Sequence, residues 1–190
     1  MLAKCLRISA AASLLCILPS ALAAYRHQGF GALYTGADAI VLGEIVAVAD
    51  ETYSVRIDEV LRASTSASVA ASHIIKVQRF HNWKCAARWK AYAKGQRLLL
   101  FLGCSGENHS SARVWHALGA AVEGEMPIEG GFVFVGASGD GSFIDERHIV
   151  YGSSYPSRRF ALSTVLAALR SGSLPPDLLR APLGRPPSNQ

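Results

Sequence analysis

The pattern of hydrophobic and polar positions predicts β-strands along most of this chain. Residues 39–48 form an apolar, β-branched run in which Glu44 is the only charged residue. A second segment follows in which Tyr53, Val55 and Ile57 alternate with polar residues. Because side chains of a strand point alternately to its two faces, this alternation predicts one buried face and one face in water.

The alternation of the second segment breaks after Ile57. Glu59 falls on the apolar face and Val60 on the polar face. A slip of one residue is typical of a β-bulge, which bends a strand and helps a sheet to close into a barrel. The sequence therefore predicts a strong bend in this strand.

The remaining pattern predicts shorter elements. Five consecutive apolar residues, Leu98 to Leu102, predict a central strand covered on both faces. Further strands are expected at 73–80 and 114–121, a hairpin at 131–136 and 142–150, an exposed mobile loop at 63–72, one helical turn at 32–35, and short helices at 82–94 and 163–170. In the last helix, Ser163 is the expected N-cap and Gly172 the expected C-terminal stop.

The first 23 residues have the pattern of a secretory signal peptide. Lys4 and Arg7 precede an uncharged apolar run at 8–18, and Ala21-Leu22-Ala23 has the small-x-small form of a cleavage site. The apolar run is too short for an ordinary membrane-spanning helix, and an uncleaved anchor is the alternative. Cleavage would give a secreted or periplasmic protein whose mature chain has no membrane span.

Composition and length fit one ordinary domain. The chain has 190 residues, of which 50% are hydrophobic and 17% are charged, and this excludes an intrinsically disordered chain. The formal charge is +5 and would fall on loss of the signal peptide, which is no argument for nucleic acid. The expected organisation is a signal peptide at 1–23, a single β-barrel domain at 24–172, and a proline-rich flexible tail at 173–190.

These elements predict a mainly β fold, a small, partly open OB-type barrel of about five to seven strands with a short C-terminal α-helix. Three segments strengthen this interpretation: 37–45 as a strand entering a barrel, 53–62 as its hairpin partner, and 95–102, which follows the lone Cys85. In this order they resemble exported bacterial proteins of the netrin-module type. The resemblance covers roughly residues 37–104 and implies an OB-type barrel similar to that of the tissue inhibitors of metalloproteinases.

The resemblance does not extend to the inhibitory group. The animal inhibitors act through a cysteine at the mature N-terminus, whereas cleavage here would leave Ala24 or Tyr25. They also carry several disulfides, and the mature chain has only Cys85 and Cys104. The resemblance therefore implies a fold and gives little support to protease inhibition.

Cys85 and Cys104 are expected to form one disulfide, since Cys5 and Cys16 leave with the signal peptide. In an oxidising compartment such a bond, closing a loop of about twenty residues, contributes roughly 3 kcal/mol. The alternative is a zinc site, because His81 and His109 lie near the two cysteines with ligand-like spacing.

A second metal reading concerns the N-terminus. Cleavage after Ala24 would place His27 third in the mature chain, where its imidazole, the free amine and two backbone amides suit Cu(II) or Ni(II). Cleavage after Ala23 fits the small-x-small pattern better and moves this histidine to the fourth position. We therefore expect no cofactor.

An aromatic and basic stretch at 79–97 is the main candidate for ligand binding. Aromatic rings stack on bases or sugars, and cations hold anionic groups. The alternative is structural: Cys85, Trp89 and Tyr92 would share one face of a helix packed on the barrel, with the cations solvated. The candidate ligand contacts are Arg79, Trp83, Lys84, Arg88, Trp89, Lys90 and Lys94.

No compact catalytic motif is present in the sequence. The glycine-flanked Ser105 and Ser138 do not lie in the motif that exposes a nucleophilic serine on a sharp turn. The adjacent acidic pairs at 58–59 and 145–146 lie on expected strands and would point to opposite faces. We therefore predict an exported, non-catalytic binding module for a protein or surface partner, and the alternatives are an envelope polyanion- or glycan-binding protein and a zinc- or copper-binding protein.

Overall fold

The computed structural model describes residues 28–65, 67–81, 88, 90–104, 114–119, 123–135, 147–150, 153–156 and 158–176. The expected signal peptide and nearly all of the expected tail lie outside these residues. The helices are α1 (Phe30–Gly36) and α2 (Leu162–Ser171). The strands are β1 (Ala39–Val48), β2 (Thr52–Ala63), β3 (Ile74–Gln78), β4 (Arg97–Cys104), β5 (Val114–Ala117), β6 (Glu125–Glu129), β7 (Phe132–Val135), β8 (Arg147–Val150), β9 (Ser153–Pro156) and β10 (Arg158–Ala161).

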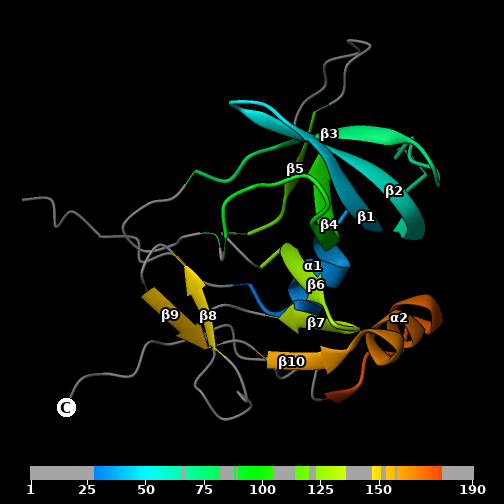
Figure 1. Ribbon diagram of the computed structural model, residues 1–190. Helices are drawn as coiled ribbons and strands as arrows, with labels where there is room; N and C mark the ends of the chain where they lie inside the picture. The colour runs from blue at the N-terminus through cyan, green and yellow to red at the C-terminus, as the bar shows by residue number, and fades with distance from the viewer. Residues whose placement is uncertain are drawn as a thin grey trace, which may run out of the picture.

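The first five strands close into a barrel of OB type (Figure 1). Their order is β1-β2-β3-β5-β4, and β4 pairs back onto β1. The β3–β5 pair is parallel, while the other pairs of the barrel are antiparallel. This confirms the mainly β, OB-type fold with a short C-terminal helix. The barrel is closed, and the sheet extends from β4 through β6 and β7 to β10.

The sharp bend of β2 lies where the sequence predicts it. Leu42 of β1 is opposite Glu59, whereas the next residue, Gly43, is opposite Ile57, so Asp58 is the extra residue of a bulge. A Cβ atom on Gly43 would lie 2.6 Å from the carbonyl oxygen of Arg56. Glycine is therefore required here, because β1 and β2 approach each other closely at the bend.

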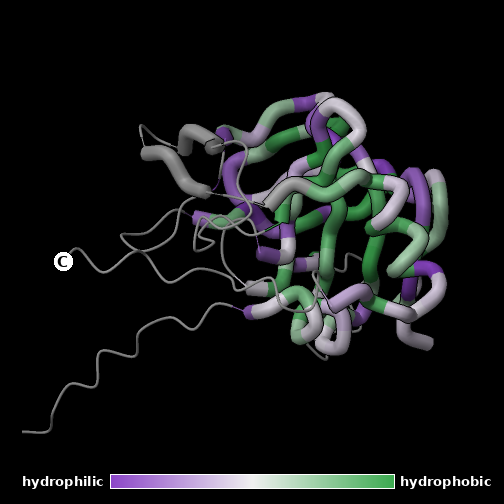
Figure 2. Tube along the Cα trace, turned by 90° about the horizontal axis from the view of Figure 1, so that it is seen from below, coloured by the Kyte–Doolittle hydropathy of each residue, from purple (hydrophilic) through white to green (hydrophobic). Residues whose placement is uncertain are grey.

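Strands β1 and β4 are buried on both faces because they separate two hydrophobic cores. One set of their side chains, including Val41 and Leu100, fills the barrel with residues of β2, β3 and β5. The alternate set, including Ile40 and Phe101, packs against α1, α2, β6 and β7. Figure 2 shows the resulting concentration of hydrophobic segments within the body of the molecule. This double burial explains why both strands read as continuous apolar runs.

The C-terminal helix covers the second core. Its buried residues Val165, Leu166 and Leu169 form an apolar stripe, and Gly172, the expected stop, ends the helix with φ of 69°. The N-cap is Ala161, rather than the expected Ser163. Figure 1 shows α2 lying next to β10 and β7. No helix in the described part of the chain is both long and apolar enough to cross a membrane.

Two local predictions were wrong. Strand β7 pairs with β6 and β10, and β8 pairs with β9, so the expected hairpin between 131–136 and 142–150 does not form. Residues 90–94, expected in the helix at 82–94, are irregular. The rest of that stretch, except Arg88, lies outside the described residues.

Candidate functional site

A hollow opens where β3 and β5 end. The two strands pair only at Lys76 with Val114 and at Val77 with Trp115, and beyond these pairs the ladder stops. The hollow has a volume of about 280 Å³ and is lined by residues 78–81 together with His116, Ala117 and Gly119. Because the two strands separate after these pairs, the residues that follow, Gln78 on β3 and His116 on β5, lie on opposite sides of the hollow.

Arg79 is the fixed cation of the hollow. Its Nη1 donates to the carbonyl oxygens of Ala49 and Asp50 at 3.0 and 2.8 Å. Its guanidinium carbon lies 5.0 Å from the centroid of the Tyr92 ring. Its Nε is buried and, among the described residues, has no hydrogen-bond partner. Two carbonyls bonded to Nη1 and the Tyr92 ring therefore hold this guanidinium in place.

Two histidines also line the hollow. His81 is exposed, and its Nε2 lies 3.0 Å from Glu51 Oε2. His116 is opposite Gly103 on β4, where a Cβ atom would come within 2.7 Å of His116 Nε2. The glycine at 103 thus makes room for this imidazole at the wall of the hollow.

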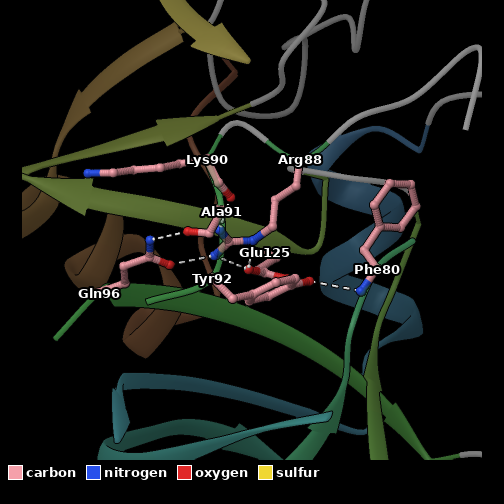
Figure 3. A network of polar contacts seen from close by, with 7 residues as sticks. All are labelled: Phe80, Arg88, Lys90, Ala91, Tyr92, Gln96 and Glu125. Atoms are coloured by element: carbon pink, nitrogen blue, oxygen red, sulfur yellow. Dashed lines mark hydrogen bonds and ion pairs between the residues drawn. The ribbon is translucent and has the colours of Figure 1, made fainter. Parts of the chain in front are cut away.

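Figure 3 shows a buried ion pair, Arg88 with Glu125, and the residues bonded to it. Both Nε and Nη2 of Arg88 lie 2.6 Å from Glu125 Oε1, and the two side chains are 0% and 1% exposed. Arg88 also donates to Gln96 Oε1 at 2.9 Å and to the carbonyl of Lys90. Gln96 in turn donates to the carbonyl of Ala91 at 2.7 Å. This network fixes the irregular stretch 90–96 against β6.

Tyr92 connects the ion pair with the hollow. Its hydroxyl donates to Glu125 Oε2 at 3.1 Å and accepts the backbone N–H of Phe80 at 2.8 Å. The guanidinium of Arg88 lies over the Tyr92 ring, with its carbon 3.8 Å from the ring centroid. Because Phe80 lines the hollow, the buried network positions part of the wall.

Burial dominates the electrostatics of this network. It raises the pKa of Glu125 above the ordinary 4.5, against the opposing effects of Arg88 and Tyr92. It also raises the pKa of Tyr92 and the pKa of Tyr53 well above the ordinary 10.0, and the nearby Glu125 charge adds to both shifts. The Tyr53 ring lies 4.7 Å from that of Tyr92, and among the described residues its buried hydroxyl has no hydrogen-bond partner.

An outward surface adjoins the hollow, and we call Ile74, Lys76 and Val114 the outer β3–β5 face. The side chain of Ile74 is 64% exposed and that of Val114 is 39% exposed. Lys76 is exposed between them, since it is two residues from Ile74 on β3 and directly opposite Val114 on β5. The face therefore combines two exposed aliphatic side chains with a cation.

The structure distributes the expected ligand-binding residues over different environments. Arg79 lines the hollow, and Lys90 and Lys94 are exposed. Arg88 differs from the expectation for a ligand contact, because it is buried and its charge is already matched by Glu125. Trp83, Lys84 and Trp89 lie outside the described residues.

The expected cysteine and metal sites fall partly outside the described residues. Cys104 ends β4, is half-buried, and is a free thiol as far as the described residues go, and its N–H donates to Asp38 Oδ2 at 2.9 Å. Cys85, His109 and His27 lie outside, so the Cys85–Cys104 disulfide and both metal readings remain predictions. Within the described part, no group of three metal-ligating side chains occurs, and His81 pairs with Glu51.

Sequence reasoning missed Glu125 and His116. Glu125 is the single charged residue of the run 125–128, which is otherwise apolar, and this is a signal for a buried carboxylate with a cationic partner. His116 carries no comparable signal, since only the pairing of β5 with β3 brings it beside residues 78–81.

Comparison with known proteins gives no further constraint on this site. No protein-family model matches the sequence, and no curated protein matches it.

Proposed function

We propose that this chain is an exported, non-catalytic binding module that holds a protein partner on the outer β3–β5 face. The observation that carries the proposal is the exposure of Ile74 and Val114 on neighbouring strands, at 64% and 39%. A single exposed aliphatic residue is ordinary on a protein surface, but two on adjacent strands beside a cation form the centre of a small contact surface.

The framework behind this face suits a binding role. The barrel is closed, and the interior is filled by apolar side chains from all five strands. The outer β3–β5 face is therefore presented on strands rather than on a loop, which lowers the entropic cost of ordering on binding. Export and the netrin-module resemblance are part of the proposal on sequence grounds alone, and the proposal includes no protease inhibition.

Binding of a polyanion or glycan by the 79–97 stretch is less well supported than binding of a protein. The buried Arg88 is matched by Glu125 and is not available to an outside anion. Lys90 and Lys94 are exposed, but exposed lysines are common on any soluble surface. Lys90 and Lys94 alone do not define a binding site.

Site-specific photo-crosslinking in cells that export the protein tests the proposal. A photoreactive residue replaces Ile74 or Val114 in separate variants, and the same residue replaces Ala167 as a control. Ala167 is a suitable control because it is also an exposed apolar residue and lies on α2, which packs against the other hydrophobic core. We expect a discrete protein adduct from positions 74 and 114 and none from position 167. Equal adducts at all three positions, or none, would overturn the proposal.

A further inference from the structure

We propose that the hollow binds a carboxylate group, presented by an acidic side chain of the partner, through the Nε–Nη2 edge of Arg79. This inference rests on the proposed function, because the hollow adjoins the outer β3–β5 face: Gln78 of its lining is two residues beyond Lys76 on the same strand. It adds the chemical class of the group that the site recognises.

The hydrogen bonds of Arg79 leave one side of its guanidinium unused. Nη1 is bonded to the carbonyls of Ala49 and Asp50. In the described part of the chain, Nε has no partner although it is buried, and no hydrogen bond is formed by Nη2. Since a buried donor without a partner is costly, this edge is the part of the hollow most in need of an acceptor.

The unused edge matches a carboxylate in shape and charge. The two nitrogens of a guanidinium edge donate parallel hydrogen bonds to the two oxygens of a planar carboxylate. The guanidinium is already oriented by its two carbonyl partners and by the Tyr92 ring, so little conformational entropy is lost when a ligand binds.

The remaining lining allows an anion to enter. Gln78, His81 and His116 contribute polar side chains to the lining, and none of the three is acidic. Two acidic residues close to this lining have partners: Glu51 pairs with His81, and the buried Glu123 beside Gly119 has interactions of its own. A volume of about 280 Å³ accommodates the end of a glutamate or aspartate side chain.

The test uses propionate, which has the structure of a glutamate side chain, titrated into the isotope-labelled full exported chain and followed by NMR. Inorganic phosphate is titrated in parallel, and chloride maintains the ionic strength. We expect saturable shifts at the amides of residues 79–81 and of Gly119, with tighter binding of propionate than of phosphate. Tighter binding of phosphate, or shifts that do not saturate, would overturn the inference.

Three variants locate the binding energy. Arg79→Lys keeps the charge but removes the two parallel N–H donors of the guanidinium edge, and we expect the Kd for propionate to rise about tenfold. Gln78→Glu places a carboxylate at the mouth of the hollow and should weaken binding by about fivefold or more. Ala167→Glu adds the same charge on the exposed side of α2 and serves as the control, with an unchanged Kd. Equal affinity of all three variants would contradict the assignment to Arg79.

The two experiments fail independently. Crosslinks at Ile74 without propionate binding would remove the carboxylate site and leave the partner face in place. Saturable propionate binding without any crosslink would support the site and remove the outer β3–β5 face as a protein contact.

Discussion

Arg88 and Glu125 form an ion pair inside the protein, with Nε 2.6 Å from Oε1 and both side chains closed to solvent. A buried pair of this kind is costly to desolvate, and its attraction offsets that cost only while both partners are present. Gln96 accepts a hydrogen bond from Arg88, and Tyr92 donates one to Glu125. These two bonds link the pair to the irregular stretch 90–96 and to the hollow. The pair is therefore the element on which the local structure of the site depends.

The first prediction concerns the removal of one partner of the pair. Arg88→Met should lower the free energy of unfolding by about 3–5 kcal/mol, because Glu125 would be left buried without its cation. The double variant Arg88→Met/Glu125→Leu should be more stable than Arg88→Met alone, since it removes both charges. Urea unfolding of the three proteins measures this, and a loss below about 1 kcal/mol in Arg88→Met would contradict the account.

The second prediction concerns the link between the pair and the hollow. Tyr92→Phe removes the hydroxyl that bonds both Glu125 and the Phe80 amide, and should cost about 1–3 kcal/mol. Hydrogen exchange at the Phe80 amide should become faster in this variant. Tyr34→Phe is the control, because the Tyr34 hydroxyl makes no hydrogen bond within the described residues. Unchanged exchange at Phe80 in Tyr92→Phe would show that the link does not position the wall.

The third prediction is an alkaline transition. The pKa values of Tyr53 and Tyr92 are raised in the folded protein, so the unfolded chain loses these protons first. Their contribution to stability is therefore complete below the ordinary pKa of 10.0 and declines as the pH rises above it. Absorbance of tyrosinate should show two of the tyrosines ionising only together with the loss of the fold measured by circular dichroism. Ionisation of all tyrosines near the ordinary pKa with the fold intact would be the opposite result.

The fourth prediction concerns the attachment of α2 to the barrel. Arg170 donates from Nε and Nη2 to the two oxygens of Glu59, at 2.8 and 2.7 Å, and these bonds lower the pKa of Glu59 below the ordinary 4.5. The stabilisation is present above pH 4.5 and is lost as the pH falls through the lowered pKa. Both groups are substantially exposed, so the effect is small and weakens with salt.

A comparison of unfolding curves at several pH values tests this contact. The parent should be more stable than Arg170→Gln at neutral pH, and the difference should vanish in acid. A difference that stays constant from neutral to acidic pH would mean that the contact stabilises by packing rather than by charge.

The fold could be predicted from the sequence where local pattern and tertiary environment agree. The doubly buried β4 is recognisable from five consecutive apolar residues, 98–102, and the bend of β2 from the slip at Glu59. The prediction of a hairpin at 131–150 is wrong because glycines indicate a turn but do not determine which strands pair on either side of it. In the structure β7 instead pairs with β6 and with β10, which begins beyond residue 150.

The candidate site could be predicted only in part. The basic residues of 79–97 are visible in the sequence, but their environments in the fold differ because their partners are distant in the chain. Arg88 is buried and pairs with Glu125, 37 residues away in the sequence. Arg79 is oriented by carbonyls that are 29 and 30 residues away. The spacing of Tyr92 predicts that it lies on a helical face, whereas in the structure it lies in an irregular segment held by tertiary hydrogen bonds.

The most direct test of the proposed function is quantitative capture of the partner from the exported fraction by the immobilised mature protein. The account predicts that the parent and Ala167→Glu retain the same specific protein, and that Ile74→Asp loses it while remaining folded by circular dichroism. Equal retention by all three proteins, or no protein retained above a blank matrix, would contradict the claim that the outer β3–β5 face is a binding surface.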